Sequence, residues 1–394
     1  MTYVHGSRLW TKNFIAICFS SFFIYITVYM LNTTLPTFVK EVLHGNQQQM
    51  GLVITLWSVG VIAFRLFSGR WIEMIGLKKT AIISFLLFFL AVAIYLGAYG
   101  ILFLLIVRLI HGGSFAVAAT ATSTLAADLI PDSQKGEGIG YFSMFMSIAM
   151  VIGPAIGAYV IHGYDNSQAL FIVSLILSGL SLICLVFVRH SQQTSVRLIT
   201  NEKKSWRNLI ERKVLPISFV GFLLSFSYSS LTSFIFSYTM EMNLSRFSGL
   251  FFVIFALIII VSRPLVGIAL DKWREHFIVY PGTIIFVIGV ILLSKSETGF
   301  LLLLSAAIIG FGYGALFPCF QLLAIQAVAL ERRNIAISTF FLFFDLGFGI
   351  GSFVLGWIAS KTSYQSMYLV AAIAGLACSA VYFAVHHPFL KRDK

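Results

Sequence analysis

Apolar residues recur in twelve long runs along the chain, separated by short polar segments. The runs cover residues 14–38, 50–70, 80–98, 101–127, 139–161 and 168–188, and then 214–239, 248–270, 277–294, 299–328, 335–359 and 365–386. A helix needs about 20 mostly apolar residues to cross a bilayer core. Because the runs are continuous, without the polar and apolar alternation of membrane barrels, they predict transmembrane helices. The expected fold is an all-α integral membrane protein with twelve spans, six on each side of one polar gap.

Composition narrows the function classes. Hydrophobic residues make up 59% of the 394 residues and charged residues only 11%, against about 45–50% and about 25% in soluble domains. This excludes a soluble enzyme, a nucleic-acid-binding domain and a disordered chain. A membrane enzyme is a distant alternative, since no paired acids, metal cluster or nucleophile appear at a membrane face. We therefore expect no enzymatic activity, no metal and no cofactor, and no nucleic acid as a partner.

The net charge of +12 is mostly explained by an excess of basic residues on one side of the membrane. With the N-terminus inside, twenty Lys and Arg residues fall in cytoplasmic segments. The opposite side holds four, which are Lys40, Arg246, Lys295 and Lys361. Cytoplasmic loops carry an excess of Lys and Arg, so we predict that both termini are cytoplasmic.

The polar gap differs from the other loops. Residues 189–213 contain seven Lys and Arg and two Glu. We interpret the segment as a solvated basic linker; a short amphipathic helix on the inner membrane surface is the alternative. The expected organisation is an N-terminal half (1–188), the linker (189–213) and a C-terminal half (214–394).

The two halves repeat one another at one constant shift, which is almost half the length of the chain. At this shift two basic residues, one acidic residue and three glycines each meet a residue of the same kind. The pairs are Arg65 and Arg263, Gly69 and Gly267, Glu73 and Asp271, Gly112 and Gly310, Lys135 and Arg333, and Gly153 and Gly351. Transporters are often built from two such repeats, so we predict two pseudo-symmetric six-helix halves.

The loop between the second and third predicted helices carries a spaced set of glycines and charges. It contains Gly69, Glu73, Gly76 and Lys78 and resembles the G-x3-D-[RK]-x-G-[RK]-[RK] motif of the major facilitator superfamily. Among the departures from that motif, Glu73 stands for the usual Asp and Met74 for a basic residue.

Two further motifs support the resemblance. The R-x3-G motif of the fourth helix appears at Arg108 and Gly112, and Asp128 lies in the loop that follows. The fifth helix carries Gly153-Pro154-x2-Gly157, the centre of a motif associated with proton-driven exporters, with alanine at both outer glycine positions. The resemblance covers essentially the whole chain. It implies the fold of that superfamily and alternating access in a bacterial inner membrane; we also expect a monomer.

The resemblance also implies a gate on the cytoplasmic side. There Glu73 would pair with Arg65 or with the positive N-terminal end of the eleventh helix. Glycines allow helices to approach closely, and Pro154 bends the fifth helix. The predicted gating residues are Arg65, Gly69, Glu73, Gly76, Lys78, Asp128, Gly153, Pro154, Gly157, Arg263, Gly267 and Asp271.

Asp345 is the only acid near the middle of a predicted span. An apolar setting favours the neutral form of a carboxyl group, so Asp345 is the first candidate for proton coupling; a structural ion pair is the alternative. The resemblance adds Arg108, which would take part in proton handling or meet an anionic group of the substrate. His111 is expected to have a packing role.

The substrate-binding residues are predicted from aromatic and polar positions on helices that line the cavity of the resembling family. Tyrosines there offer a stacking surface and a hydroxyl to an amphipathic ligand. The candidates are Tyr25, Tyr29, Asn32, Arg108, Tyr228, Phe234, Tyr238, Tyr313 and Phe317.

The sequence thus predicts a proton-coupled exporter of a small amphipathic molecule, driven by the proton gradient and similar to the drug/proton antiporters. Two alternatives within the same fold stay open. One is an exporter of an opine-type metallophore, whose carboxylates would suit Arg108; the other is a nutrient symporter or uniporter.

Overall fold

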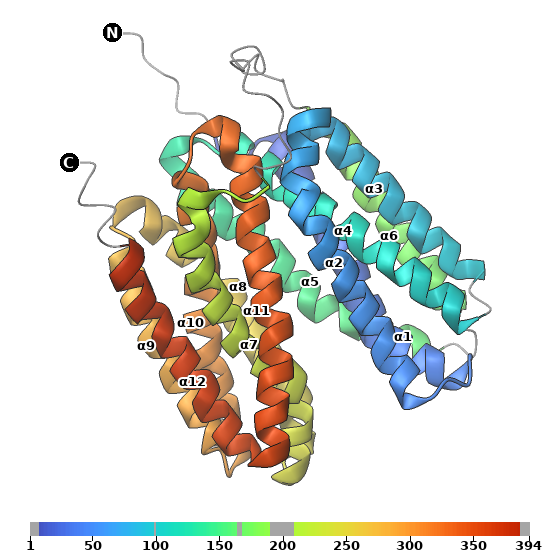
Figure 1. Cartoon of the computed structure of the whole chain (residues 1–394), viewed down its shortest axis with the longest axis vertical. Helices are drawn as coiled ribbons and strands as arrows, with labels where there is room; N and C mark the ends of the chain where they lie inside the picture. The colour runs from blue at the N-terminus through green and yellow to red at the C-terminus, as the bar shows by residue number, and fades with distance from the viewer. Residues whose placement is uncertain (1–7, 98–99, 164–167, 190–208, 387–394) are drawn as a thin grey trace. The chain divides into compact units, whose positions relative to one another are not determined.

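The computed structural model describes residues 8–97, 100–163, 168–189 and 209–386, and the regular elements within these ranges are helices (Figure 1). Among the described residues, twelve helices are long and apolar enough to cross a membrane. The all-α, twelve-span prediction is therefore confirmed. Most of the predicted linker (190–208) and the ends of the chain lie outside the described residues.

The first of two compact units comprises residues 1–210 together with residues 330–338. Its own helices are α1 (Lys12–Glu41), α2 (Gln47–Ile75), α3 (Leu77–Ile94), α4 (Ile101–Leu129), α5 (Lys135–Gly163) and α6 (Gln168–Phe187). Within this unit α2 packs chiefly on α4, α1 on α5 and α6, and α3 on α4 and α6.

The second unit comprises residues 211–329 and 339–394. Its helices are α7 (Leu215–Glu241), α8 (Ser248–Lys272), α9 (His276–Ser294), α10 (Gly299–Gln326) and α12 (Tyr364–Val381). It also holds most of α11 (Arg333–Lys361), whose first turns are grouped with the first unit. Here α8 and α9 pack on α10, and α12 packs on α7 and α9. These contacts match the α2–α4, α3–α4, α1–α6 and α3–α6 pairings of the first unit.

Glycine contacts show that the sequence repeat is also a repeat of packing. A Cβ added to Gly112 would lie 2.1 Å from the carbonyl oxygen of Trp57. A Cβ added to Gly310 would lie 2.7 Å from the carbonyl oxygen of Phe255. The shift that relates Gly112 to Gly310 also relates Trp57 to Phe255, so α2–α4 and α8–α10 meet at equivalent positions.

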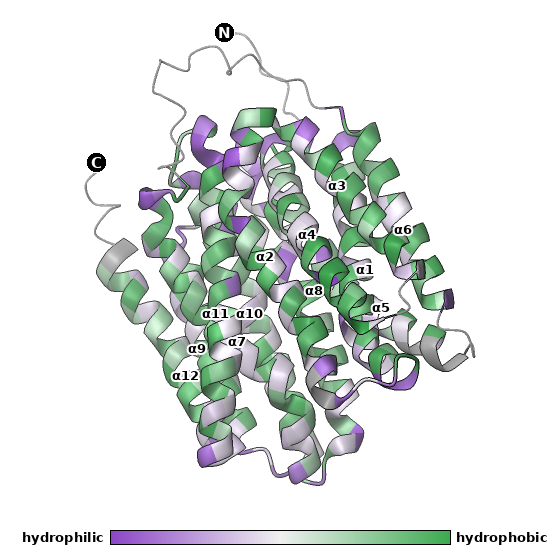
Figure 2. Ribbon diagram, turned by 45° about the vertical axis from the view of Figure 1, so that its right-hand side comes forward, coloured by the Kyte–Doolittle hydropathy of each residue, from purple (hydrophilic) through white to green (hydrophobic). Residues whose placement is uncertain are grey.

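The outward faces of the helices suit a lipid environment. Hydrophobic residues cover most of the helix surfaces, and hydrophilic residues gather near the helix ends (Figure 2). Leu102 and Phe353 are 74% and 78% exposed, a degree of exposure that would be costly for such side chains in water. In lipid, helices satisfy their own backbone groups and expose apolar side chains at little cost.

The junction between α2 and α3 depends on one glycine. Gly76 has φ 97°, a region that residues with a Cβ rarely adopt. Its backbone N–H caps α2 by donating to the carbonyl of Ile72 at 2.9 Å. The glycine of the predicted loop motif thus allows two long helices to follow each other directly.

Candidate functional site

A buried cationic cluster lies inside the first unit, around Arg108 of α4. Arg108 is 0% exposed. Its Nε donates to the carbonyl of Val53 in α2 at 3.0 Å, and its Nη2 donates to Oδ1 of Asn32 in α1 at 2.5 Å. The structure therefore joins two predicted binding residues, Asn32 and Arg108. Each hydrogen-bond partner that the described residues offer this guanidinium is neutral.

His111 lies one turn after Arg108 on α4 and completes the cluster. Its Nδ1 is 3.5 Å from Arg108 Nη1 and 3.1 Å from the hydroxyl of Tyr95, which follows α3. A guanidinium only donates hydrogen bonds, so the longer contact with Arg108 favours an Nδ1 that accepts, whereas the Tyr95 hydroxyl fits either tautomer. His111 thus has polar contacts in addition to packing, since its ring centroid lies 4.4 Å from that of Phe88.

An aromatic series connects the predicted tyrosines of α1 to this cluster. The ring centroids of Tyr25 and Tyr29 lie 6.1 Å apart, and Tyr25 meets Phe115 edge-on at 5.1 Å. Phe115 in turn lies 5.6 Å from Trp57, whose ring is 5.7 Å from the guanidinium carbon of Arg108. A series of ring contacts therefore leads from half-buried Tyr29 to the buried charge.

A second aromatic cluster forms inside the second unit. Tyr228 of α7 stacks on Tyr313 of α10 with ring centroids 4.3 Å apart. Tyr313 stacks on Phe317 at 6.1 Å, and the guanidinium of Arg263 lies 5.2 Å from the Phe317 ring. Three predicted substrate-binding residues, Tyr228, Tyr313 and Phe317, are thereby brought together; each is at most 7% exposed.

Asp345 lies beside this aromatic cluster on α11. The ring centroid of the preceding residue, Phe344, lies 5.1 Å from that of Phe317. The ring centroid of Phe348, one turn later on the helix, lies 6.3 Å from that of Tyr228. Asp345 is half-buried and comes twelve residues after Arg333, about 18 Å along the helix at a rise of about 1.5 Å per residue. The carboxyl group is therefore well inside the span.

The two remaining aromatic candidates lie in the C-terminal half of α7. Phe234 is half-buried and its ring centroid is 6.4 Å from that of Tyr364. Tyr238 is 0% exposed, and its hydroxyl donates to the carbonyl of Leu293 at 2.9 Å. Tyr238 thus joins α7 to the end of α9 in this structure.

The predicted gating acid, Glu73, lies at the end of α2. It forms an ion pair with Arg70 at 2.8 Å and a longer contact of 3.9 Å with Arg332. Asp128, at the end of α4, lies 3.6 Å from Arg333. Residues 330–338 belong to the first unit, so both acids of the motif loops contact basic residues of that segment.

Hydroxyl groups continue this contact deeper in the first unit. Ser338 donates to the carbonyl of Arg65 at 2.6 Å, and its Oγ is 3.0 Å from that of Ser68. The Arg65 guanidinium donates to the carbonyl of Ala116 at 3.1 Å. Next to them, a Cβ on Gly69 would lie 2.8 Å from Cα of Ile335.

The other predicted gating residues are spread over both units. Lys78 donates to the carbonyl of Leu185 at the end of α6. Cβ atoms on Gly153 and Gly157 would come within 2.9 Å and 2.7 Å of α1, and Pro154 lies inside α5 without ending it. In α8, Gly267 is buried and Asp271 is exposed.

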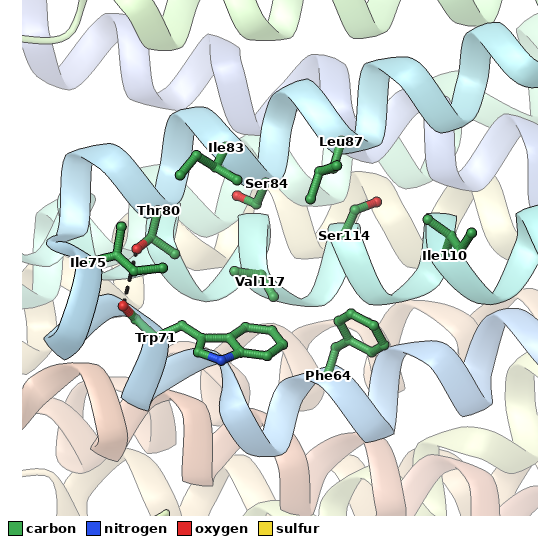
Figure 3. A pocket seen from close by; sticks show the side chains of 10 residues that line it. All are labelled: Phe64, Trp71, Ile75, Thr80, Ile83, Ser84, Leu87, Ile110, Ser114 and Val117. Carbon is green, nitrogen blue, oxygen red and sulfur yellow. Dashed lines mark hydrogen bonds between the residues drawn. The ribbon is translucent and has the colours of Figure 1, made fainter. Parts of the chain in front are cut away.

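A membrane-facing pocket of about 170 Å³ lies between α2, α3 and α4 (Figure 3). Apolar side chains such as Ile83, Leu87 and Ile110 line it and are themselves exposed. Thr80 donates to the carbonyl of Trp71 at its edge, at 3.4 Å. The pocket contains none of the predicted binding residues.

Sequence reasoning missed Trp57 and Tyr95, which surround the Arg108 guanidinium and His111. Trp57 carried one usable signal, since the shift between the two halves places it opposite Phe255, a member of the second aromatic cluster. Tyr95 carried no such signal. It is 16 residues away from His111 in the chain, and the hydropathy pattern does not indicate which side chains of successive helices meet.

Comparisons with known proteins give one consistent family. A sequence profile described as Major Facilitator Superfamily matches residues 17–329 and 282–394. An uncharacterised MFS-type transporter of Burkholderia pseudomallei is 23% identical over 385 residues, which are 95% of this chain and 92% of that protein. Multidrug resistance protein 2 of Bacillus subtilis is 24% identical over 217 residues, 54% of each chain.

Two solved structures have a similar fold. The MFS transporter FucP in its outward conformation superposes with a TM-score of 0.79 at 16% identity, covering 95% of this chain and 98% of its own. The human organic anion transporter MFSD10 gives 0.77 at 13% identity, covering 94% and 98%. At such identities the likeness concerns the fold alone.

Proposed function

Because this chain belongs to the major facilitator superfamily of transporters, we propose that it exports a small amphipathic molecule in exchange for protons, by alternating access in a bacterial inner membrane. The observation that carries the proposal is the position of Asp345. It is an ionisable group inside a membrane span, and such groups are costly and usually functional.

The surroundings of Asp345 support a role in coupling. It is half-buried, with Phe344 and Phe348 on either side joining the Tyr228 and Tyr313 stack through ring contacts. A substrate that stacks on the tyrosines would change the surroundings of Asp345, and this change would promote release of the proton.

The direction of transport rests on sequence relationship. The Gly153-Pro154-x2-Gly157 segment resembles the motif of proton-driven exporters, and one relative is named a multidrug resistance protein. Gly153 and Gly157 approach α1 closely, so α1 and α5 can slide where larger side chains would interlock.

The test uses inside-out membrane vesicles that acidify their interior. Three fluorescent probes cover the charge classes: ethidium (cation), pyrenebutanamide (neutral) and pyrenebutyrate (anion). We expect wild-type vesicles to accumulate at least one probe when the pH gradient is present. Asp345→Asn should lose this gradient-dependent accumulation, because the amide does not bind and release a proton.

Glu297→Gln is the matched control, since it removes an exposed carboxyl group from the loop between α9 and α10. It should transport like wild type. Full gradient-driven transport by Asp345→Asn with an unchanged pH dependence would contradict the coupling assignment. Accumulation only in right-side-out vesicles would contradict export.

A further inference from the structure

We propose that Arg108 and Trp57 form a binding subsite for a carboxylate group of the transported molecule, and that Asn32 fills this subsite when no substrate is bound. The inference rests on the proposed transport function and specifies its substrate class, an amphipathic carboxylate. It concerns residues of the first unit alone.

The first argument is the charge of Arg108. Its side chain is 0% exposed, and its described hydrogen-bond partners are the carbonyl of Val53, the amide of Asn32, the ring of His111 and the hydroxyl of Tyr95. A buried charge with only neutral partners costs several kcal/mol. Neutral acceptors offset part of this cost, whereas an anion would compensate the charge itself.

The second argument is an excess of donors. The indole Nε1 of Trp57 and Nε2 of His111 are buried and have no hydrogen-bond partner among the described residues. Trp57 Nε1 can only donate. Buried polar groups are seldom left unpaired. Arg108 and Trp57 therefore offer more donors than the described residues around them accept, and the group that best satisfies this excess is an anion with several acceptor lone pairs.

The third argument is the shape of the present occupant. Oδ1 of Asn32 accepts from Arg108 Nη2 at 2.5 Å, and an amide oxygen is planar and similar in size to a carboxylate oxygen. Asn32 is half-buried, whereas Arg108 is 0% exposed. A substrate carboxylate can replace this oxygen, and two parallel N–H···O bonds to a guanidinium are stronger than one bond to an amide.

The aromatic residues specify the rest of the ligand. Tyr25, Phe115 and Trp57 form a continuous series of ring contacts that ends at Arg108. A ligand whose carboxylate reaches Arg108 would place its apolar body along these rings. We therefore expect an aromatic or aliphatic acid rather than a small inorganic anion.

The test measures binding to the purified full-length protein in detergent, as a shift of the melting temperature with ligand concentration. Pyrenebutyrate is the probe, and pyrenebutanamide, which differs only by an uncharged amide, is the comparison. We expect the acid to raise the melting temperature of wild type and the amide to leave it unchanged. Equal shifts for both compounds would overturn the proposal.

Two variants locate the effect. Arg108→Gln should lose the shift with the acid. Asn32→Asp places a carboxylate against Arg108 within the chain, so the ligand-free melting temperature should rise and the shift with the acid should disappear. Asn46→Asp, which adds an acid at the N-cap of α2, is the matched control and should respond like wild type. A wild-type response by Asn32→Asp would overturn the proposal.

This readout requires no proton gradient and no direction of transport. Binding of the acid without accumulation in vesicles would contradict the export proposal and leave the carboxylate subsite in place. Accumulation of ethidium alone, with no shift by pyrenebutyrate, would contradict the subsite and leave the export proposal in place.

Discussion

At the scale of single residues, Gly112 makes the tightest helix–helix contact among the glycines of the repeat. A Cβ there would lie 2.1 Å from a backbone oxygen of α2, and a backbone carbonyl does not rotate away as the end of a flexible side chain can. The glycine therefore sets the distance between α2 and α4, the two helices that carry Trp57 and Arg108. The subsite around Arg108 depends on this close approach.

We predict that Gly112→Ala destabilises the protein. Overpacking of a tight site costs about 1–3 kcal/mol, so the melting temperature of the purified protein should fall. Gly51→Ala in α2 is the control, because an added Cβ there meets no atom within 4 Å. Alanine favours a helix over glycine by about 0.5–1 kcal/mol, so this control should be at least as stable as wild type. Equal melting temperatures for both variants would show that α2 and α4 can separate freely.

For single residues, the sequence predicts which positions are structurally important better than it predicts which residues surround them. The repeated glycines could be found because their pairs share one shift along the chain. The partners of Arg108 could not, since Asn32 is 76 residues away and Val53 is 55 residues away. Because α4 is apolar or small on nearly every side, its pattern does not indicate which face meets α1 or α2.

At the scale of elements, the beginning of α11 has a separate role from the rest of the helix. Residues 330–338 are grouped with the first unit and the following residues with the second. Ser338 bonds to the backbone of Arg65 and lies against Ser68, while Arg332 and Arg333 meet Glu73 and Asp128. We infer that these contacts hold the first turns of α11 in place.

We predict that Ser338→Ala loosens these turns. A buried hydrogen bond contributes about 1 kcal/mol, and Ser338 is 1% exposed. Amide hydrogen exchange in residues 330–338 should become faster. Ser360→Ala is the control, because that exposed hydroxyl bonds only one turn back, to the carbonyl of Trp357. Unchanged exchange in Ser338→Ala would show that the ion pairs alone hold the segment.

The helices themselves were largely predictable. Every predicted span corresponds to one helix, and the ends agree within five residues; the largest differences are at α2, predicted to end at 70 and observed to end at Ile75, and at α12. Length and hydropathy suffice because lipid allows few other structures. The grouping of residues 330–338 with the first unit depends on contacts between distant segments, which hydropathy does not describe.

At the scale of the whole molecule, the distribution of basic residues predicts the orientation in the membrane. Lys79 at the start of α3 and Lys361 at the end of α11 are both exposed, and the excess of cytoplasmic Lys and Arg places them on opposite sides. Lys79 is expected inside the cell and Lys361 outside.

Cysteine labelling of intact cells checks this orientation. A membrane-impermeant maleimide should label Lys361→Cys, whereas Lys79→Cys should react only after the membrane is permeabilised. The native cysteines Cys18, Cys319 and Cys378 are buried and Cys184 is half-buried, so unmodified protein provides the background. Labelling of Lys79→Cys in intact cells would reverse the predicted topology.

The contacts of Gly153 and Gly351 also record how the two halves have diverged. These glycines are equivalent in the repeat, and they meet Ile26 and Phe226. At the shift that relates the glycines, Ile26 corresponds to Leu224. The observed contact of Gly351 is instead with Phe226, two residues further along the chain. The first half therefore has two extra residues before α2, and they fall between the helices, where residues 42–46 correspond to residues 242–244.

Inside a helix, two extra residues would have rotated everything after them by about 200°. This difference in length between the halves therefore falls in a loop and not inside a helix. Insertions introduced there by evolution or by protein engineering leave both helical registers intact.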